Sequence, residues 1–387
     1  MTAGPGTGSG TSAPATPSGH GTVPTEPQHA GRDIPLPSPE HRARGLGTVL
    51  GIAVAVIFAL LPFVDVDVPV ILPGLLSSPG ALQVLAIGLV FAGVAMSYDV
   101  VFGYTGLLSF GHALFFGVAV YGTNLLMVHA GWGFGVSALA AVLLSATTAA
   151  LVGAVALRAR GIAFAMVTLA FVEAFAIFLI TDPLGITGGE DGLALARDGV
   201  PDLFRGVLNT RNLYWLALAF AVVTYLVVRQ CTASSGGRVW QAVRENEDRV
   251  ELLGIRPYPV KLLAFVVGGT LAGVGGCVYL LVVRGANPDV AGADFALALL
   301  IMVVLGGSGR LWGAALGGLI YGLLTLRLPA LSTSGVLDGL PEWLENVVAE
   351  PLFVLGTLFV LLVLFVPQGI AGSVERVRAA LVRRSSP

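Results

Sequence analysis

The sequence predicts an all-α protein, a polytopic membrane helical bundle of about ten transmembrane helices. Three observations lead to this fold class. First, 55% of the 387 residues are hydrophobic and 11% are charged, with a mean hydropathy of +0.86, whereas soluble domains carry roughly 25% charged residues. Second, the apolar residues form separate runs of about 20 residues, the length that a helix needs to cross ~30 Å of hydrocarbon. Third, the charged stretch 238–253 has helical periodicity and interrupts these runs.

Residues 1–45 are expected to form a disordered cytosolic tail. They are rich in Gly, Pro, Ser and Thr and almost free of large apolar side chains, so they cannot bury enough surface to offset the entropy of ordering. The histidines in or beside this tail lack metal-ligand spacing, and no metal site is predicted in the chain. The membrane domain is expected to cover residues 46–370, and residues 371–387 are expected to form a cytosolic C-terminal tail.

Ten apolar runs are predicted to span the membrane. Their approximate limits are 46–64, 81–101, 107–128, 133–157, 161–181, 212–229, 260–283, 294–308, 311–328 and 351–367. The third run contains Ser109, His112 and Asn124, and these polar residues predict a break in that helix. The run 294–308 is short, so it is either re-entrant or continuous with the run that follows it.

The distribution of positive charge predicts that both termini are cytosolic. With ten spans and the N-terminal tail inside, most of the 21 Lys and Arg residues fall on the cytosolic side, as the positive-inside rule requires. The exceptions, which fall outside, are Arg197, Arg205, Arg211, Arg284 and Arg327.

The charged segment 230–259 contains one predicted amphipathic helix, from Arg238 to Leu253. Apolar residues recur along it at steps of three, four or seven and mark a single face. The residues of this face are Val239, Trp240, Val243, Val250 and Leu253. On the other face, Arg244 lies four residues before Asp248, and this spacing predicts an ion pair. The same spacing predicts a pair between Glu245 and Arg249.

Gly254 stands directly after this helix, where a left-handed C-terminal cap is expected. Pro257 and Pro259 follow and forbid continuation of the same helix. Two readings of the segment remain open. It is either a helix that lies on the membrane surface and closes a long loop, or a helix presented to the groove of a partner protein.

Several motifs that carry chemistry do not occur in the chain. The sequence contains no phosphate-binding G-x-x-x-x-G-K-[ST] loop, and Lys261 is its only lysine. The short run 306–309 reads instead as a tight turn on the cytosolic side. Metalloprotease and nucleophile-elbow motifs are also missing. Any ATP that drives this protein must therefore be hydrolysed by another chain, and no bound cofactor is expected.

The charged segment resembles the cytosolic coupling segment of ABC-transporter inner-membrane permeases for branched-chain amino acids, the LivH/LivM-type family, and is LivM-like. The family pattern is roughly R-A-x-R-E-N-E-x-A-A-E-x-L-G-I, and here Arg249 and Val250 replace its paired alanines. The resemblance implies that this segment is a cytosolic coupling helix that contacts an ATPase subunit. The residues expected to form this contact are Trp240, Arg244, Glu245, Asn246, Glu247, Glu251 and Gly254.

Four further stretches resemble the same family, at 103–117, 157–173, 187–192 and 302–313, so that the resemblance covers roughly residues 85–375. In the first of these stretches, Leu107 stands where the family usually has Gln. The stretch 187–192 reads TGGEDG, and its residues Gly188, Gly189, Asp191 and Gly192 are expected to form an outer-loop turn with exposed backbone amides. This turn either receives a substrate-delivering partner or is a plain solvated turn.

Three polar residues within the predicted spans are candidates for the translocation path: Ser109, His112 and Glu173. His112 is either a hydrogen-bonded packing residue or part of the path. A carboxylate near mid-membrane costs about 2.5–3.5 kcal/mol on insertion scales, so Glu173 should face protein or water. It either contacts substrate or holds two helices together. Asp99 is expected at the cytosolic interface, without a special role.

Three function classes compete. A membrane-embedded enzyme would need a convergent set of catalytic groups, which these sparse residues do not provide. A secondary transporter or channel for a small polar solute would explain the spans but not the charged helix. The resemblance implies a permease subunit of an ABC importer for branched-chain amino acids, or for a related solute such as urea or amides. Its expected partners are two ABC ATPase subunits, a second related permease subunit, an extracytoplasmic substrate-binding protein and the lipid bilayer, without nucleic acid. The expected location is the bacterial cytoplasmic membrane.

Overall fold

The computed structural model describes residues 51, 53–66, 74–206 and 209–332, together with isolated positions outside these ranges. The chain divides into two units, Met1–Gly51 and Ile52–Pro387, and nearly all described residues belong to the second. The predicted tails and the predicted span 351–367 lie largely outside the described residues.

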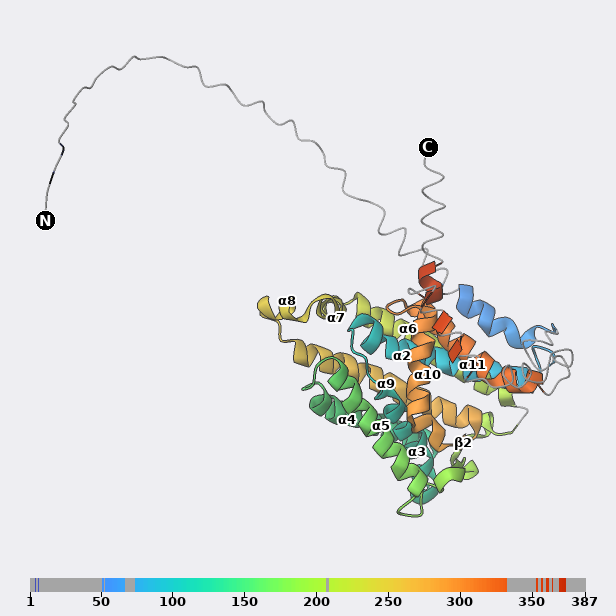
Figure 1. Cartoon of the computed structure of the whole chain (residues 1–387). Helices are drawn as coiled ribbons and strands as arrows, with labels where there is room; N and C mark the ends of the chain where they lie inside the picture. Colours follow the sequence, from blue (N-terminus) through green and yellow to red (C-terminus); the bar gives the residue numbers. More distant parts are fainter. Residues whose placement is uncertain are drawn as a thin grey trace, which may run out of the picture. The chain divides into compact units, whose positions relative to one another are not determined.

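The described part of the second unit is built from α-helices (Figure 1). They are α2 (Pro79–Asp99), α3 (His112–Ala130), α4 (Phe134–Ala156), α5 (Ile162–Thr181), α6 (Thr210–Ala233), α7 (Ser235–Glu245), α8 (Glu247–Leu252), α9 (Pro257–Val283), α10 (Ala293–Gly306) and α11 (Leu311–Ser332). Helix α2 continues into a π-helical turn, η2 (Val100–Tyr104). Two strands of two residues each, β1 (Leu193–Ala194) and β2 (Gly285–Ala286), pair antiparallel in the described region.

Seven of the described helices are long and apolar enough to cross a membrane: α2 with η2, α3, α4, α5, α6, α9 and α11. Two shorter apolar helices, Ala53–Phe63 and α10, accompany them. The limits of these nine helices agree with nine of the ten predicted runs to within a few residues, except at the start of Ala53–Phe63 and of α3. The prediction of an all-α, multi-pass membrane protein is therefore confirmed.

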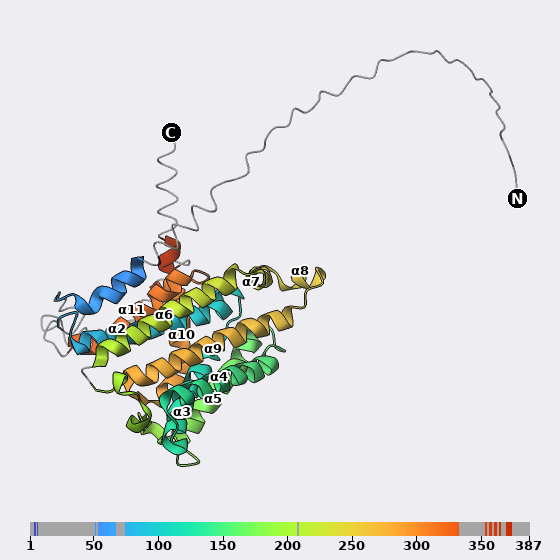
Figure 2. The same ribbon diagram turned by 180° about the vertical axis from the view of Figure 1, so that it is seen from behind.

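Helix α2 forms the centre of the bundle, where it packs against α6, α9 and α11. Helix α9 lies between α2 and α6 on one side and α3 and α4 on the other, as both Figure 1 and Figure 2 show. Because α2 is enclosed on all sides, almost every residue from Leu85 to Val101 is buried. The outer faces of α4, α5 and α6 carry exposed apolar side chains such as Leu139, Met166 and Leu226, as expected for helices in contact with lipid.

Glycines allow these helices to approach closely, as predicted for membrane bundles. A Cβ atom on Gly273 of α9 would lie 2.6 Å from the Ser145 hydroxyl of α4. On α11, a Cβ atom on Gly317 would lie 1.8 Å from the carbonyl oxygen of Met302 in α10. Side chains at either position would therefore force the paired helices apart.

Two predicted spans differ in detail from the structure. The third begins at His112 rather than at residue 107, so Ser109 lies in the non-helical segment between η2 and α3. The short predicted run 294–308 is a separate helix of 14 residues, α10. It is not continuous with α11, because Gly307 and Gly309 have positive φ angles of 110° and 78° and turn the chain sharply.

Candidate functional site

The charged segment forms two short helices, so the predicted single helix from Arg238 to Leu253 is wrong. Helix α7 begins after Ser234, whose hydroxyl oxygen accepts the N–H of Gly237. It ends at Asn246, which is extended (φ −162°, ψ 103°) and caps α8 by accepting the N–H of Arg249 at 2.9 Å. Asparagine side chains compete with the backbone for hydrogen bonds and favour such caps over helix interiors.

Trp240 anchors α7 to the membrane bundle. Its side chain is 3% exposed, and its indole N–H donates to the carbonyl oxygen of Val260 at 3.0 Å. The ring packs in a small apolar cluster with Val100, Val228, Ala264 and Leu311. Trp240 therefore faces the interior of this chain, together with the buried Val243 and Val250.

The end of α8 is an exposed apolar tip, which we define as Leu252, Leu253 and Ile255. Leu252 and Leu253 are 88% and 75% exposed, so the prediction that Leu253 lies on one face with the buried Trp240 is wrong. The break at Asn246 rotates α8 relative to α7 and turns Leu253 outward. Gly254 has a φ of +83°, which confirms the expected left-handed cap.

The hydrogen bonds around Gly254 form a Schellman motif. Its N–H donates to Glu251 at 2.9 Å, and the N–H of Ile255 donates to Val250 at 3.3 Å. These bonds fix the direction in which the chain leaves α8. The apolar tip is therefore held by backbone geometry as well as by the anchor at Trp240.

Three charged side chains of the segment, Arg244, Glu247 and Asp248, contact neighbouring elements. Neither predicted pair forms, because the helix that was to align Arg244 with Asp248 and Glu245 with Arg249 is interrupted. Asp248 lies 3.9 Å from Arg160, with both side chains exposed.

Two other charges of the segment contact neighbouring elements. Glu247 pairs with Lys261 of α9. The guanidinium of Arg244 donates to the carbonyl oxygen of Gly103 in η2. Glu245 and Glu251 are exposed to solvent.

Asp99 was expected at an interface without a special role, but it is completely buried at the end of α2. Its Oδ1 atom accepts the N–H of Gly309, in the turn between α10 and α11, at 2.8 Å. Sequence reasoning missed this contact because 210 residues separate its partners.

Two of the three candidate path residues, Ser109 and His112, lie inside the chain and are 0% exposed. Ser109 accepts the N–H of Gly111 at 3.1 Å. The imidazole of His112 packs edge-on against Tyr98, with ring centroids 5.0 Å apart. Neither ring nitrogen of His112 has a hydrogen-bond partner among the described residues.

Glu173 occupies a different environment on α5, half-buried. Its Oε1 atom accepts the N–H of Ala293 at 3.1 Å. Ala293 is the first residue of α10, whose N-terminal N–H groups have no partner within that helix. Glu173 thus holds α5 and α10 together, while remaining partly accessible.

The predicted outer-loop turn 187–192 is held by Asp182, at the C-terminus of α5. One carboxylate oxygen accepts the N–H groups of Ile186 (2.7 Å) and Thr187 (2.9 Å), and the other accepts that of Gly188 (3.1 Å). The N–H of Thr187 and then those of Ile186 and Gly188 hold the pKa of this carboxyl below its ordinary value. Sequence reasoning missed Asp182, although an acidic residue directly after a helix and before a glycine-rich turn is a local signal.

The glycines of this turn are required by its geometry. Gly188, Gly189 and Gly192 all have positive φ angles. A Cβ atom on Gly188 would lie 2.1 Å from the carbonyl oxygen of Gly192. A Cβ atom on Gly192 would lie 2.2 Å from the carbonyl oxygen of Ala286 in β2. Asp191 is exposed, so its carboxylate is available to a partner.

Asn124 of α3 holds the strand that follows the turn. Its side-chain amide donates to Ala194 at 3.0 Å, and its carbonyl oxygen accepts the N–H of Ala196 at 3.1 Å. The side-chain amide of Asn124, one of the polar groups that predicted a break in the third span, thus forms its hydrogen bonds with the loop backbone. The charged segment lies at the opposite end of α9 from β2 (Figure 1), and 27 helical residues correspond to about 40 Å.

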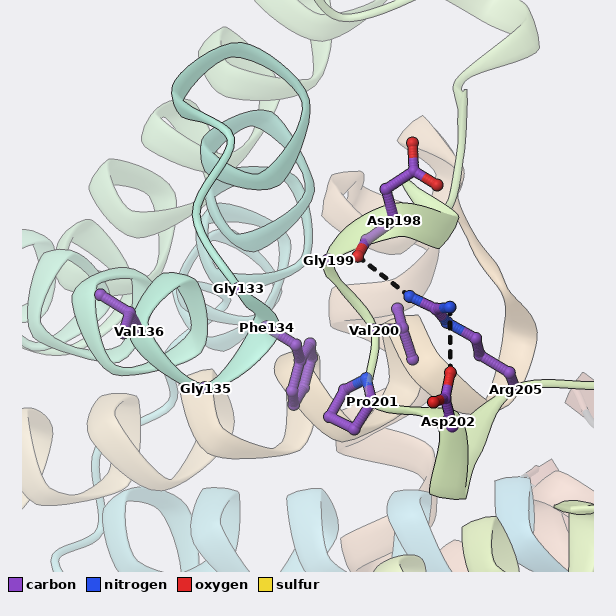
Figure 3. Close-up of a pocket in the computed structure, with 10 residues that line it drawn as sticks. All are labelled: Gly133, Phe134, Gly135, Val136, Asp198, Gly199, Val200, Pro201, Asp202 and Arg205. Atoms are coloured by element: carbon purple, nitrogen blue, oxygen red, sulfur yellow. Dashed lines mark hydrogen bonds and ion pairs between the residues drawn. The ribbon is translucent and has the colours of Figure 1, made fainter.

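An open hollow lies beside this loop, between the turn from α3 to α4 and the segment 198–205 (Figure 3). Its volume is about 480 Å³. Phe134 and Pro201 supply apolar walls. Arg205 pairs with Asp202 at 3.0 Å and donates to the carbonyl oxygen of Asp198 at 2.9 Å, which fixes the shape of its rim.

Residues 80–363 match the family described as "Branched-chain amino acid transport system / permease component". The chain belongs to this permease family. It is accordingly a transport permease and not an enzyme, and the resemblance seen in the sequence is confirmed.

Individual permeases of known name are similar to this one at modest identity. The permease is 27% identical to the high-affinity branched-chain amino acid transport permease LivM of Escherichia coli over 315 residues, covering 76% of this chain and 70% of that protein. It is 26% identical to LivH of the same organism, covering 75% of this chain and 94% of that protein. The probable LivM of Methanocaldococcus jannaschii is 26% identical to this permease over 275 residues, covering 61% of this chain and 77% of that protein. No solved structure matches the permease.

Proposed function

We propose that this permease forms, with a second related permease subunit, the path by which branched-chain amino acids enter a bacterial cell across the cytoplasmic membrane. Relatives named for branched-chain amino acid transport support this substrate class. Escherichia coli has both a LivM and a LivH among these relatives, which supports a pair of different permeases. Both termini are cytosolic in this proposal.

The observation that carries the proposal is the geometry of α7 and α8. A segment outside the long apolar helices is anchored by Trp240 and ends in an exposed apolar tip. Exposed apolar side chains of this kind on an ordered segment mark a contact with another protein or with the membrane surface, and the proposal takes the protein contact. The proposed partner is one of two ATPase subunits, which hydrolyse the ATP that this chain has no motif to bind.

The predicted coupling residues take separate roles in this contact. Leu252 and Leu253, which are not among the predicted coupling residues, enter the ATPase groove, and the predicted Glu245 and Glu251 lie at its polar rim. The remaining five hold the tip in place from the permease side: Trp240, Arg244, Asn246, Glu247 and Gly254. Closure of the ATPases on ATP then moves the whole segment and shifts the permeases from one access state to the other.

The path for the substrate runs past α5, where Glu173 provides a partly accessible carboxylate that can pair with an amino acid's ammonium group. Ser109 and His112 reach the path only after the helices around them separate. At the other end of the bundle, a substrate-binding protein docks on the turn at Gly188, Gly189, Asp191 and Gly192 and in the adjoining hollow (Figure 3).

A secondary transporter or channel is the second candidate, favoured by the half-buried charge of Glu173 within a span. It would move solute without ATP. Uptake into proteoliposomes that hold the assembled complex, with and without internal ATP, separates the two classes. The same assay distinguishes the two substrate classes, because it compares the uptake of leucine, isoleucine and valine with the uptake of urea.

The coupling contact is tested by Leu253→Asp, with Leu184→Asp as matched control. Both leucines are exposed, at 75% and 67%, and Leu184 lies in the predicted outer loop. We expect Leu253→Asp to abolish co-purification of the ATPase subunits and leucine uptake, because a carboxylate in an apolar groove is strongly unfavourable. Leu184→Asp should retain the ATPases. If Leu253→Asp binds and transports like the wild type, the tip has no role in coupling.

A further inference from the structure

Three segments that lie far apart in the sequence meet at the end of α2, on the side of the coupling segment. Asp99 and Gly103 come from α2 and η2, Arg244 from α7, and Gly309 from the turn between α10 and α11. Gly309 donates its N–H to Asp99, and Arg244 donates to the carbonyl oxygen of Gly103. One junction therefore connects the coupling segment with both neighbouring elements of the bundle.

The junction is closely packed around its glycines. A Cβ atom on Gly103 would lie 1.8 Å from Oδ1 of Asp99 and 2.4 Å from the nitrogen of Gly309. A Cβ atom on Gly309 would lie 2.8 Å from Nη1 of Arg244. The aliphatic stem of Arg244 covers Gly106, where a Cβ atom would lie 2.9 Å from its Cγ. Because these positions carry no side chain, α7, η2 and the α10–α11 turn lie in close contact at the junction.

The carboxylate of Asp99 is only half satisfied in this arrangement. Its residue is 0% exposed, and its Oδ2 atom has no hydrogen-bond partner among the described residues. A buried carboxylate oxygen without a partner is unfavourable. The guanidinium of Arg244, on α7, lies at the same junction, where it bonds to the Gly103 carbonyl. A bond from this guanidinium to Oδ2 of Asp99, in place of its bond to the Gly103 carbonyl, would complete the hydrogen bonding of the carboxylate.

We propose that Asp99 and Arg244 are a pair of positioning residues that transmits the movement of α7 to α2 and to the α10–α11 turn. In the present arrangement Arg244 holds η2 through Gly103. In the alternative arrangement it binds Oδ2 of Asp99, which draws α7 toward α2. The two arrangements make the junction bistable, as a switch between two access states requires. This inference rests on the coupling function proposed above.

The test uses the whole reconstituted transporter, with both permeases, the ATPases and the binding protein. Asp99→Asn keeps an oxygen for the N–H of Gly309 and removes the charge, and Arg244→Gln removes the cation. We expect each variant to lower substrate-stimulated ATP hydrolysis about five-fold or more, the range of a typical coupling energy. The KM for the loaded binding protein should stay unchanged. The double variant should lose no more of the substrate-stimulated ATP hydrolysis than either single variant loses. Arg244→Lys, which keeps the charge, should retain more stimulation than Arg244→Gln.

The matched control is Arg238→Gln, which removes an exposed cation from the same helix. Its stimulation should stay at the wild-type level. The proposed pairing of Asp99 and Arg244 is wrong if Asp99→Asn keeps wild-type stimulation of ATP hydrolysis. It is also wrong if the losses of the two single variants add up in the double variant. Either result would leave the proposed permease function intact. A wild-type complex that neither retains ATPase subunits nor responds to substrate would instead overturn the proposed function itself. Co-purification of the ATPases with every variant distinguishes these outcomes.

Discussion

Glu173 and Ala293 are joined by a hydrogen bond of 3.1 Å, so that a carboxylate from α5 caps the first turn of α10. The pair connects a long apolar helix with a short one, and it explains how a charged residue is accommodated in a predicted span. Because the carboxylate is only half-buried, it can also be reached from outside the pair. The two roles that the sequence left open are therefore compatible, and substitutions can separate them.

Glu173→Gln should keep the fold and reduce transport. The amide oxygen of Gln still accepts the N–H of Ala293, so the thermal unfolding temperature should stay near that of the wild type. Glu173→Ala, which removes the cap, should destabilise by about 1 kcal/mol. If the charge binds the substrate's ammonium group, leucine uptake by Glu173→Gln should fall roughly tenfold, as for loss of a charged hydrogen bond worth ~1.5 kcal/mol. Unchanged uptake would leave Glu173 with the structural role alone.

Asp182→Asn should loosen the turn 187–192 in a pH-dependent way. The folded pKa of Asp182 is lowered by the N–H groups that it accepts. Its stabilising contribution is therefore complete above the unfolded pKa of about 3.9 and is lost as pH falls through the lower folded pKa. Limited proteolysis of the loop at pH 7 should be faster in Asp182→Asn than in the wild type. The difference should shrink in acid, and an equal difference at every pH would contradict this account.

Gly254→Val should weaken coupling through the backbone alone. A Cβ atom on Gly254 would meet nothing within 4 Å, yet a φ of +83° costs a residue with a Cβ about 1–2 kcal/mol. The chain should relieve this strain by leaving the Schellman geometry, which redirects the apolar tip. We expect reduced substrate-stimulated ATP hydrolysis in the assembled complex.

Gly254→Asn is the informative companion, since Asn tolerates left-handed backbone, and it should retain most of the stimulation. Gly236→Ala is a control within α7, because its φ is not positive and a Cβ there has ordinary contacts. Equal losses in Gly254→Asn and Gly254→Val would show that backbone handedness is not the cause.

Trp240→Ala should damage the fold of the coupling segment before it affects any partner. Removing a buried indole typically costs about 3–5 kcal/mol, so the isolated permease should unfold at a lower temperature. Trp240→Phe keeps most of the packing and loses the bond to Val260, worth about 1 kcal/mol. Thermal unfolding of the purified permease, without ATPase subunits, measures both effects. A Trp240→Ala permease as stable as the wild type would place the indole's role in the partner contact.

The proposed orientation is tested by reporter fusions. Residue 235, at the start of α7, should report from the cytosol, and residue 195, after β1, should report from outside. The physical reason is the excess of Lys and Arg in loops on the side of residue 235. Reporters at the two positions on the same side would contradict both the topology and the coupling assignment.

The sequence alone determined what depends on local composition and period. Apolar runs near 20 residues predicted the membrane helices, because a helix in lipid must satisfy its own backbone. The cap at Gly254 was predictable for a similar reason, since a left-handed turn selects glycine from its immediate neighbours. The resemblance of the charged segment and four further stretches to a permease family likewise indicated that family before any contact was known.

Only the tertiary structure decided which side chains face one another. Trp240 and Leu253 share one face in a continuous helix, and the cap formed by Asn246 places one inside and the other in solvent. Asp99, Arg244 and Gly309 meet although α2, α7 and the α10–α11 turn carry no periodic signal for that contact. Such pairings depend on the angles and positions at which the long helices cross. A charged side chain buried between helices is therefore recognised only from the residues that surround it.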